Sequence, residues 1–110
     1  MIGDIAHVFN RGVEKRKIFL DNGDYSRFAE SLYLLNNKSG KLRITKSVFD
    51  GNTRLPKQDK LVEVLKWVIM PNHYHLLLYE VMDGGIVEFV KRLGNSYTKY
   101  FNTKHQERSG

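Results

Sequence analysis

Two apolar runs separated by a Pro-Asn turn constrain the fold more than any other feature of this chain. The first run, residues 61–70, is rich in valine and isoleucine and contains the tryptophan, and the second run, residues 73–81, continues with leucines. β-branched and aromatic residues favour strands, and Pro71-Asn72 is typical of a turn. The sequence therefore predicts two neighbouring strands, apolar on both faces, at the centre of a sheet that helices cover on at least one side.

One further strand and two helices are predicted around this pair. Residues 5–10 are β-prone and end at a turn that contains Gly12. Apolar residues recur at three- or four-residue spacing after the polar cluster 21–24, and again over residues 86–101. This spacing predicts two amphipathic helices, one before and one after the paired strands.

Between the first helix and the paired strands the pattern is weaker. Residues 42–49 favour a strand, and residues 50–60 favour a polar loop or a hairpin tip. Short connections make neighbouring strands antiparallel, so the order of elements predicts an α+β sandwich with helices on one face of a central antiparallel sheet. The expected fold class is a ferredoxin-like arrangement, formed as one domain over residues 1–110.

Composition narrows the class of protein. The chain has a formal net charge of +6 and a pI near 9.6, so a polyanion is the first partner to consider. It has no cysteine, which fits a cytoplasmic protein without a disulfide framework. It has no run of about 18 apolar residues, and its first residues lack the basic and apolar regions of a signal peptide. We therefore expect no contact with a membrane.

The second strand of the pair begins with two histidines, His73 and His75, on either side of Tyr74. Residues two apart point to the same face of a strand, so these imidazoles project side by side, with Cα atoms roughly 6.5–7 Å apart. Two histidines with water and a substrate oxygen suit a catalytic divalent ion, whereas a structural zinc site needs more protein ligands. The alternative is a half-buried pair with satisfied hydrogen bonds. His7 and His105 lie in no such motif, and neither is assigned to a metal.

Two tyrosines of the last predicted helix, Tyr97 and Tyr100, are candidates for a nucleophile. A tyrosine beside a metal can attack a phosphodiester, and Lys99 between them could stabilise phosphate charge. Both tyrosines also lie on the apolar stripe that contains Leu93 and Phe101. The stripe favours a place in the core or in an interface over a catalytic role.

A basic turn follows the first strand and is a candidate for contacts with nucleic acid. Gly12 would allow a positive φ and a close approach of the backbone to a phosphate, and a solvated charged loop is the alternative. The residues expected to contact DNA lie in this turn, beside the histidines and on the polar face of the last helix: Arg11, Arg16, Asn72, Arg92 and Lys99.

Four motifs in this order resemble a known family. They are Asn10-Arg11-Gly12 ahead of Lys15-Arg16-x-Ile18-Phe19, then Asp24-Tyr25-x-Arg27-Phe28, then Met70-Pro71-Asn72-His73-Tyr74-His75-Leu76-Leu77, then Leu93-Gly94-x-x-Tyr97-x-x-Tyr100-Phe101-Asn102. Together they span nearly the whole chain and resemble the insertion-sequence-200-like, or REP-associated, tyrosine transposases. These are HUH enzymes, in which two histidines bracket a hydrophobic residue.

The resemblance implies a single-strand DNA transposase or nickase that acts on DNA hairpins, usually as a homodimer. It implies that His73 and His75 hold Mg²⁺ or Mn²⁺, which polarises the scissile phosphate. A helical tyrosine then attacks the phosphate, leaving a 5′-phosphotyrosine link and a free 3′-hydroxyl. The reverse step rejoins the strand and needs no nucleotide cofactor.

The chain departs from the family at its C-terminal end. The family's nucleophilic tyrosine and third metal ligand lie on a further helix, beyond the position of Gly110. Tyr97 and Tyr100 match the helix before it, so the resemblance gives neither of them the catalytic role. We therefore expect a domain without the tyrosine helix, which binds a divalent ion and DNA hairpins but nicks poorly or not at all.

Two other functions are considered. A non-catalytic nucleic-acid-binding module would bind with strong salt dependence, without a metal requirement and without loss of binding in His73→Ala. A metal-dependent phosphoesterase that uses water would need a third ligand and a general base. No candidate for either lies near the histidine pair in the sequence.

Overall fold

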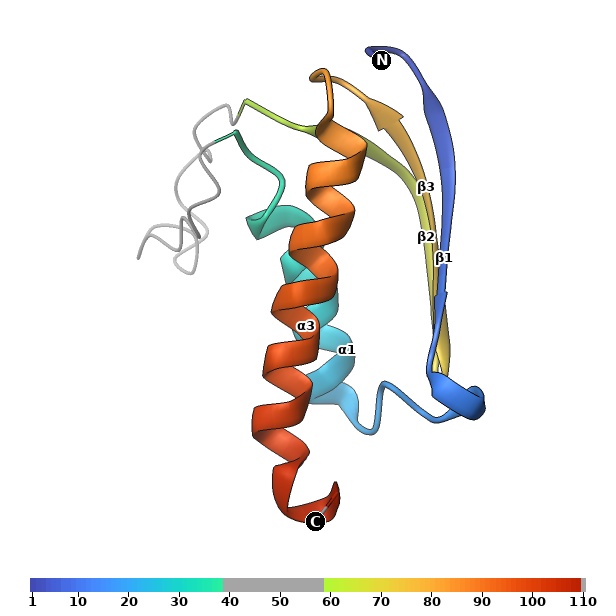
Figure 1. Ribbon diagram of the computed structural model, residues 1–110, viewed down its shortest axis with the longest axis vertical. Coiled ribbons are helices and arrows are strands. Elements are labelled where there is room, and N and C mark those ends of the chain that lie inside the picture. The colour runs from blue at the N-terminus through green and yellow to red at the C-terminus, as the bar shows by residue number, and fades with distance from the viewer. Residues whose placement is uncertain (39–58, 110) are drawn as a thin grey trace.

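The computed structural model describes residues 1–38 and 59–109 of the chain (Figure 1). The strand expected at 42–49 and nearly all of the loop expected at 50–60 lie outside these ranges. The described elements, in order, are β1 (Ile5–Arg11), the 3-10 turn η1 (Val13–Lys15), α1 (Asn22–Leu34), β2 (Val62–Met70), β3 (His73–Glu80) and α3 (Gly85–Ser109). None of the described helices combines the length and the apolar character that a membrane span requires.

The described strands form one antiparallel sheet in the order β1-β3-β2. β3 is central and antiparallel to both neighbours, so β1 and β2 run parallel to each other with α1 in the connection between them. Among the described elements, β1, α1 and β2 thus form a βαβ unit whose two parallel strands are separated by β3. The predicted α+β class is confirmed, whereas the fourth strand of a complete ferredoxin-like sheet is not among the strands that the structure describes.

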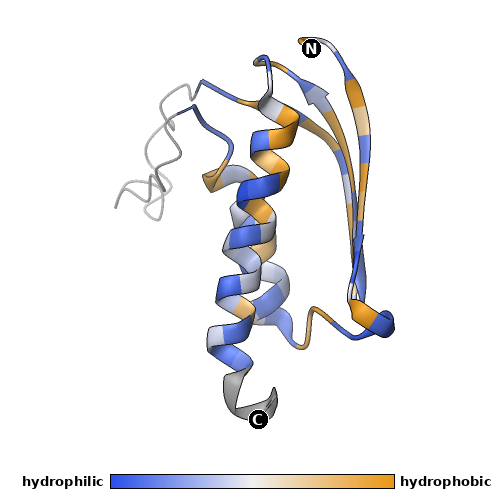
Figure 2. Cartoon of the chain, in the orientation of Figure 1, coloured by the Kyte–Doolittle hydropathy of each residue, from blue (hydrophilic) through white to orange (hydrophobic). Residues whose placement is uncertain are grey.

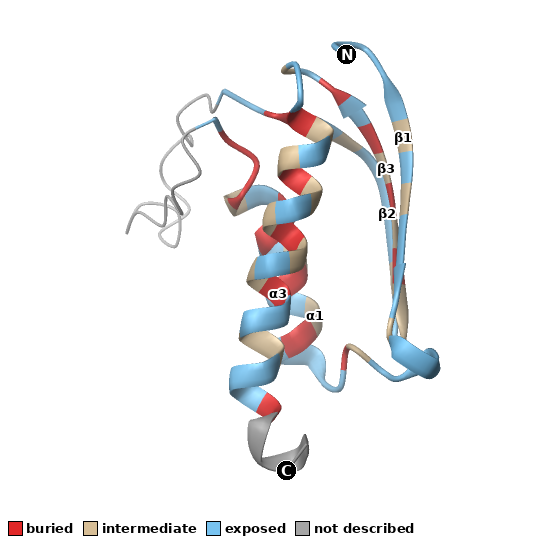
Figure 3. Ribbon diagram, viewed as in Figure 1, coloured by how far each residue is buried: buried red, intermediate tan, exposed pale blue. Residues whose placement is uncertain are grey.

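Both helices pack against the same face of the sheet and leave the other face open (Figure 1). Successive side chains of β3 point to opposite faces of the sheet. Tyr74, Leu76 and Leu78 are buried under the helices, whereas His73 and His75 are half-buried on the open face (Figure 3). The strand therefore separates an apolar core from a face that carries the histidines.

The core lies between the sheet and the two helices. Hydrophobic and hydrophilic residues interleave along both helices, as their amphipathic spacing predicts (Figure 2). At the centre, the ring of Phe28 lies 4.5 Å from that of Tyr74 and 5.6 Å from that of Tyr97, measured between centroids. The other fully buried large side chains of this core are Phe19, Phe89, Leu76, Leu78, Leu93 and Val62.

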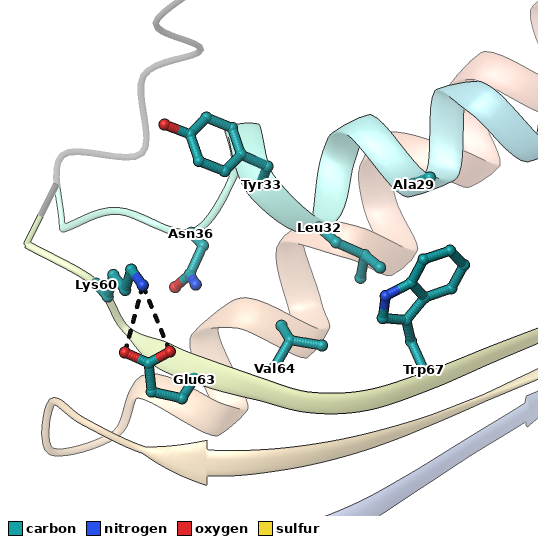
Figure 4. A pocket seen from close by; sticks show the side chains of 8 residues that line it. All are labelled: Ala29, Leu32, Tyr33, Asn36, Lys60, Glu63, Val64 and Trp67. Atoms are coloured by element: carbon teal, nitrogen blue, oxygen red, sulfur yellow. Dashed lines mark hydrogen bonds and ion pairs between the residues drawn. The ribbon is translucent and has the colours of Figure 1, made fainter. Parts of the chain in front are cut away.

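β2 lies at an edge of the described sheet, so among the described strands only β3 of the predicted pair is central. About half of the surface of Leu65 and Trp67 is exposed, and the pairing with β3 is irregular between Val64 and Lys66. An apolar run shows that both faces of a strand have apolar neighbours, but it does not show whether both edges are paired. Trp67 is covered in part by α1, across a cavity of about 300 Å³ (Figure 4).

Asn36 fixes the start of β2. Its buried side chain donates from Nδ2 to the carbonyl of Val62, and its Oδ1 accepts from the backbone N–H groups of Leu61 and Val62. The same side chain lines the cavity beside Trp67, at the end where Lys60 and Glu63 form an ion pair (Figure 4). A residue just beyond the C-terminal end of α1 thus positions the next described strand.

A hydrogen-bonded turn holds the end of β1 against the turn that precedes β3. The N–H of Gly12 donates to the carbonyl of Asn72 at 3.0 Å, and those of Ile18 and Phe19 donate to the carbonyl of Pro71 at 2.8 and 3.1 Å. The segment between them, including η1, is exposed and carries Arg16. The two turns therefore form one unit at the end of the sheet where β3 begins.

Gly12 is required in this unit for a reason other than the one predicted. Its φ is −62°, and the positive φ angles fall instead on Glu14 and Lys15, at 55° and 62°. A Cβ atom on Gly12 would lie 2.1 Å from the carbonyl oxygen of Arg16. The expectation of a positive φ at Gly12 was wrong, and close approach of two backbone segments excludes a side chain there.

We expect Gly12→Ala to lower the free energy of unfolding by about 1–3 kcal/mol, because the added methyl group forces the backbone of the turn to move. Gly94→Ala is the matched control, since Gly94 lies inside α3 and its added Cβ would meet no atom within 4 Å beyond the backbone of its own helix and its chain neighbours. It should raise stability by about 0.5–1 kcal/mol, because alanine favours the helix. Urea unfolding of the three chains measures both changes, and equal midpoints for Gly12→Ala and the parent chain would contradict the first.

Candidate metal and nucleic-acid site

His73 is the first residue of β3, directly after the turn that binds Gly12. Its Nδ1 lies 2.7 Å from Oδ1 of Asn72. An amide oxygen only accepts hydrogen bonds, so this contact favours the tautomer that carries its proton on Nδ1 and leaves Nε2 available to a metal. A ring held in this way by an oxygen on its second nitrogen is the usual arrangement of a metal-binding histidine.

His75 lies on the same open face and contacts two side chains of β1. Its ring centroid is 4.7 Å from that of Phe9 and 5.3 Å from that of His7, and it is 5.1 Å from that of His73. Its Nδ1 lies 3.3 Å from Nε2 of His7. Partial desolvation, and then the proximity of His73 and His7, lower the pKa of His75, which favours the neutral form that binds metals.

The chemistry of these donors fits a divalent cation. Imidazole nitrogen is a ligand for most divalent transition metals, and water and phosphate oxygens can complete the coordination. His73 and His75 would hold the ion, with Asn72 orienting the first of them. The geometry leaves room for a substrate, since both rings lie on the sheet face that no helix covers (Figure 1).

The basic turn lies at the same end of the sheet. Arg11 pairs with His73 in the register of β1 and β3, so both side chains project from the same face. Arg11 and Arg16 are exposed, and Asn72 is half-buried between the turn and His73. The structure thus brings two of the five residues expected to contact DNA, Arg11 and Asn72, together with His73. Arg16 instead lines a pocket with Tyr97 and Phe101 of α3.

The two predicted DNA contacts on α3 do not join this cluster. Arg92 is only 19% exposed, and its guanidinium donates to the carbonyls of Leu35 and Asn37 and pairs with Glu88. These bonds give it a structural role, in which it fixes the end of α1 to α3. Lys99 is exposed, but it belongs to α3, on the other side of the sheet from the histidines (Figure 1).

Tyr97 and Tyr100 also lie on the covered side of the sheet. The hydroxyl of Tyr97 donates to the carbonyl of Ile18, and burial raises the pKa of this tyrosine. The hydroxyl of Tyr100 donates to Asp24 at 2.9 Å, and its pKa is raised first by burial as well. Because β3 separates these hydroxyls from His73, neither can attack a phosphate bound at the histidines in the described arrangement.

A buried carboxylate that the sequence analysis did not identify joins α1 to α3. Asp24 is fully buried, and its Oδ2 accepts from the backbone N–H of Leu20 and lies 2.9 Å from Nε2 of His105. Its Oδ1 accepts from Tyr100 and from Nζ of Lys104. Burial alone would raise the pKa of Asp24, but these hydrogen bonds outweigh it and lower the pKa to about 2.

This cluster is also where three potential metal-binding groups lie closest together. In the part of the chain that the structure describes, Asp21, Asp24 and His105 are the set of three whose donor atoms all lie within 4.8 Å of one another. The ammonium of Lys104 already binds both carboxylates, at 2.8 and 3.0 Å. The cluster is therefore a structural ion-pair network, in which a protein cation neutralises the acidic groups.

The described residues thus form a basic α+β domain in which His73, His75 and Arg11 lie at one end of an open sheet face. A model of the family described as "Transposase IS200 like" matches residues 45–110, which is more than half of the chain. The chain therefore belongs to the IS200-like transposase family. No curated protein and no solved structure matches it. Membership of this family makes transposition the general function and DNA the partner.

Proposed function

We propose that this domain binds single-stranded DNA and DNA hairpins on the open face of its sheet, and that His73 and His75 hold Mg²⁺ or Mn²⁺ there. The observation that carries the proposal is the position of the histidine pair beside the exposed Arg11, on the face that the described helices leave free. The chain's membership of a transposase family supports DNA as the polyanion.

Each group in the site has a separate task in this proposal. The arginines bind backbone phosphates and set the position of the strand. Asn72 holds the ring of His73 in the tautomer whose Nε2 can bind the ion. When bound, the cation polarises a phosphodiester and stabilises the charge that develops on it.

Strand cleavage requires a nucleophile from outside the covered core. In the transposition reaction that we propose, the phenolic oxygen of a tyrosine forms a bond to phosphorus while the bond to the 3′-oxygen breaks. The products are a 5′-phosphotyrosine and a free 3′-hydroxyl, and the reverse attack by that hydroxyl rejoins the strand. Tyr97 and Tyr100 are excluded from this role in the proposal, because their hydroxyls are bonded on the other side of the sheet.

A homodimer is part of the same proposal. Apolar side chains are exposed on the open face and at the edges of the described sheet: Ile5, Phe9, Leu65, Val68 and Met70. Burying such a surface favours association between two copies of the chain. Analytical ultracentrifugation with and without a hairpin measures this, and a monomer under both conditions would contradict it.

A non-catalytic nucleic-acid-binding module is the second candidate, and the position of both tyrosines in the core favours it. The two functions differ in their need for the cation. A binding module predicts that His73→Ala binds DNA as tightly as the parent chain, with or without Mn²⁺. The transposase proposal predicts that Mn²⁺ strengthens hairpin binding by the parent chain only.

The proposal is tested by incubating the chain with labelled single-stranded hairpins and Mn²⁺, and resolving the products on native and denaturing gels. We expect a native shift and no covalent band that depends on Tyr97 or Tyr100. A covalent adduct that Tyr97→Phe or Tyr100→Phe abolishes would show that a core tyrosine is the nucleophile. No shift with any hairpin would contradict DNA binding itself.

The salt dependence of binding tests the phosphate contacts. We expect Arg11→Ala and Arg16→Ala each to reduce the slope of log K against log salt concentration by about one, because each removes one neutralised phosphate. Lys99→Ala, which removes the same charge on the other side of the sheet, should leave the slope unchanged. Fluorescence anisotropy with a labelled hairpin between 50 and 200 mM salt, about the range over which such slopes are resolved, measures all three.

A further inference from the structure

We infer that His7, on β1, is an additional ligand of the divalent cation held on the open face of the sheet. The inference rests on the proposed metal site and extends its ligand set to His7, His73 and His75. It also gives β1 a place in the metal site, which the sequence motif around β3 does not suggest.

The distance between two nitrogen atoms carries the inference. Nε2 of His7 and Nδ1 of His75 lie 3.3 Å apart. Two nitrogens that bind one tetrahedral ion at about 2.0–2.1 Å lie about 3.3–3.4 Å from each other, and about 2.9 Å in an octahedron. The two imidazoles therefore already have the separation that a shared ion requires.

The register of the sheet explains why His7 lies there. Phe9 pairs with His75 and His7 pairs with Leu77, so His7 and His75 are diagonal neighbours on the same face. Diagonal neighbours on paired strands are within reach of long or aromatic side chains. The position of His7 is thus fixed by backbone pairing and does not depend on a mobile side chain alone.

A direct hydrogen bond between the two imidazoles is the competing explanation of this distance. One ring would then donate a proton that the other accepts, and no cation would be involved. In the described residues, the donors of His7, His73 and His75 do not all lie within 4.8 Å of one another. A measurement of metal binding has to decide between a hydrogen-bonded pair and a pair of ligands.

The test is a Mn²⁺ titration of the folded chain, in which electron paramagnetic resonance measures free Mn²⁺. His7→Phe removes the ligand and keeps an aromatic ring beside His75. We expect its dissociation constant for Mn²⁺ to rise at least tenfold. Val68→Ala is the matched control, because Val68 faces His75 from the opposite strand and has no ligand atom. It should bind Mn²⁺ within about twofold of the parent chain.

A second readout follows the ligand atoms themselves. With ¹⁵N-labelled histidine and the diamagnetic probe Zn²⁺, the Nε2 resonance of His7 should shift to that of a metal-bound nitrogen. An unchanged His7 resonance at saturating Zn²⁺ would overturn the inference. Thermal melts of His7→Phe and the parent chain establish that both are folded at the titration temperature.

The outcomes separate this inference from the proposed function. If His75→Ala loses Mn²⁺ binding while His7→Phe binds like the parent chain, the cation site stands and His7 is not a ligand. If the parent chain binds no Mn²⁺, with or without a hairpin, both the inference and the metal part of the proposed function are wrong. Weakened binding in His7→Phe, with Val68→Ala unchanged, supports both.

Discussion

Asp24→Asn is expected to lower the free energy of unfolding by about 3 kcal/mol, the lower part of the range of about 3–5 kcal/mol for breaking a buried ion pair. The carboxylate is fully buried and binds Lys104, Tyr100, His105 and the N–H of Leu20. An amide keeps one acceptor but loses the charge that balances Lys104. The lower part of the range applies because the Lys104 side chain is about one-third exposed, at 34%, and stays partly hydrated.

Asp21→Asn is the matched control for this substitution. Asp21 caps the N-terminus of α1 and binds the same ammonium, but it is exposed. Asparagine is also a good N-cap, so we expect a loss below about 1 kcal/mol. Urea unfolding measures both variants, and equal losses would show that burial of Asp24 adds little to the fold.

The same carboxylate makes the fold sensitive to acid. The pKa of Asp24 is about 2 in the folded chain, below the ordinary value of 3.8. A depressed pKa stabilises the fold above the unfolded value, and this contribution is lost as pH falls from about 4 to about 2. The melting temperature of the parent chain should therefore fall more steeply over this interval than that of Asp24→Asn, and parallel curves would contradict the assignment.

His75→Ala is expected to weaken Mn²⁺ binding at least 100-fold, because it removes one of the two histidines proposed to hold the ion. Asn72→Ala should weaken it less, by about 10–100-fold, since Asn72 orients His73 through one hydrogen bond and does not touch the ion. Mn²⁺ titration measures both affinities. A larger loss of affinity in His75→Ala than in Asn72→Ala is what we expect if His75 binds the ion and Asn72 only orients His73.

Tyr79→Phe is the control for this series, because Tyr79 shares the open face of β3 with His75 but lies farther along the strand. It should bind Mn²⁺ like the parent chain. If His75→Ala and His73→Ala both keep the parent affinity, the cation binds elsewhere. The next candidate would be the cluster of Asp21 and Asp24, which Asp21→Asn tests directly.

Elements with strong local patterns were predicted correctly. The apolar runs around Pro71-Asn72 predicted β2 and β3 within one residue of their observed ends. The spacing of apolar residues predicted both helices, but α3 continues to Ser109, beyond the periodic residues 86–101. Alternation in β3 alone placed both histidines on one face, away from Tyr74. These features are determined by interactions between residues that are close in the sequence, so a local pattern is enough to predict them.

The features that the sequence did not reveal depend on pairings between distant residues. His7 reaches His75 only because β1 pairs with β3 in one particular register. Asp24 looked like part of a polar helix start, and nothing local indicates that His105, 81 residues away, would reach it. Arg92 likewise lies on what the sequence predicts as the solvated face of the last helix. In the structure it binds the carbonyls of Leu35 and Asn37, just after α1, which no local pattern indicates.

The order of strands in the sheet has a consequence for how the chain assembles. β2 and β3 are joined by a two-residue turn, whereas the contact between His7 and His75 spans 68 residues of sequence. Local hairpins form quickly, and closing a long loop carries the larger entropic cost, so we expect the docking of β1 to be slower than the formation of the β2–β3 hairpin. A cation that bridges these two histidines would act as a clip on that loop, and would slow the detachment of the N-terminal strand.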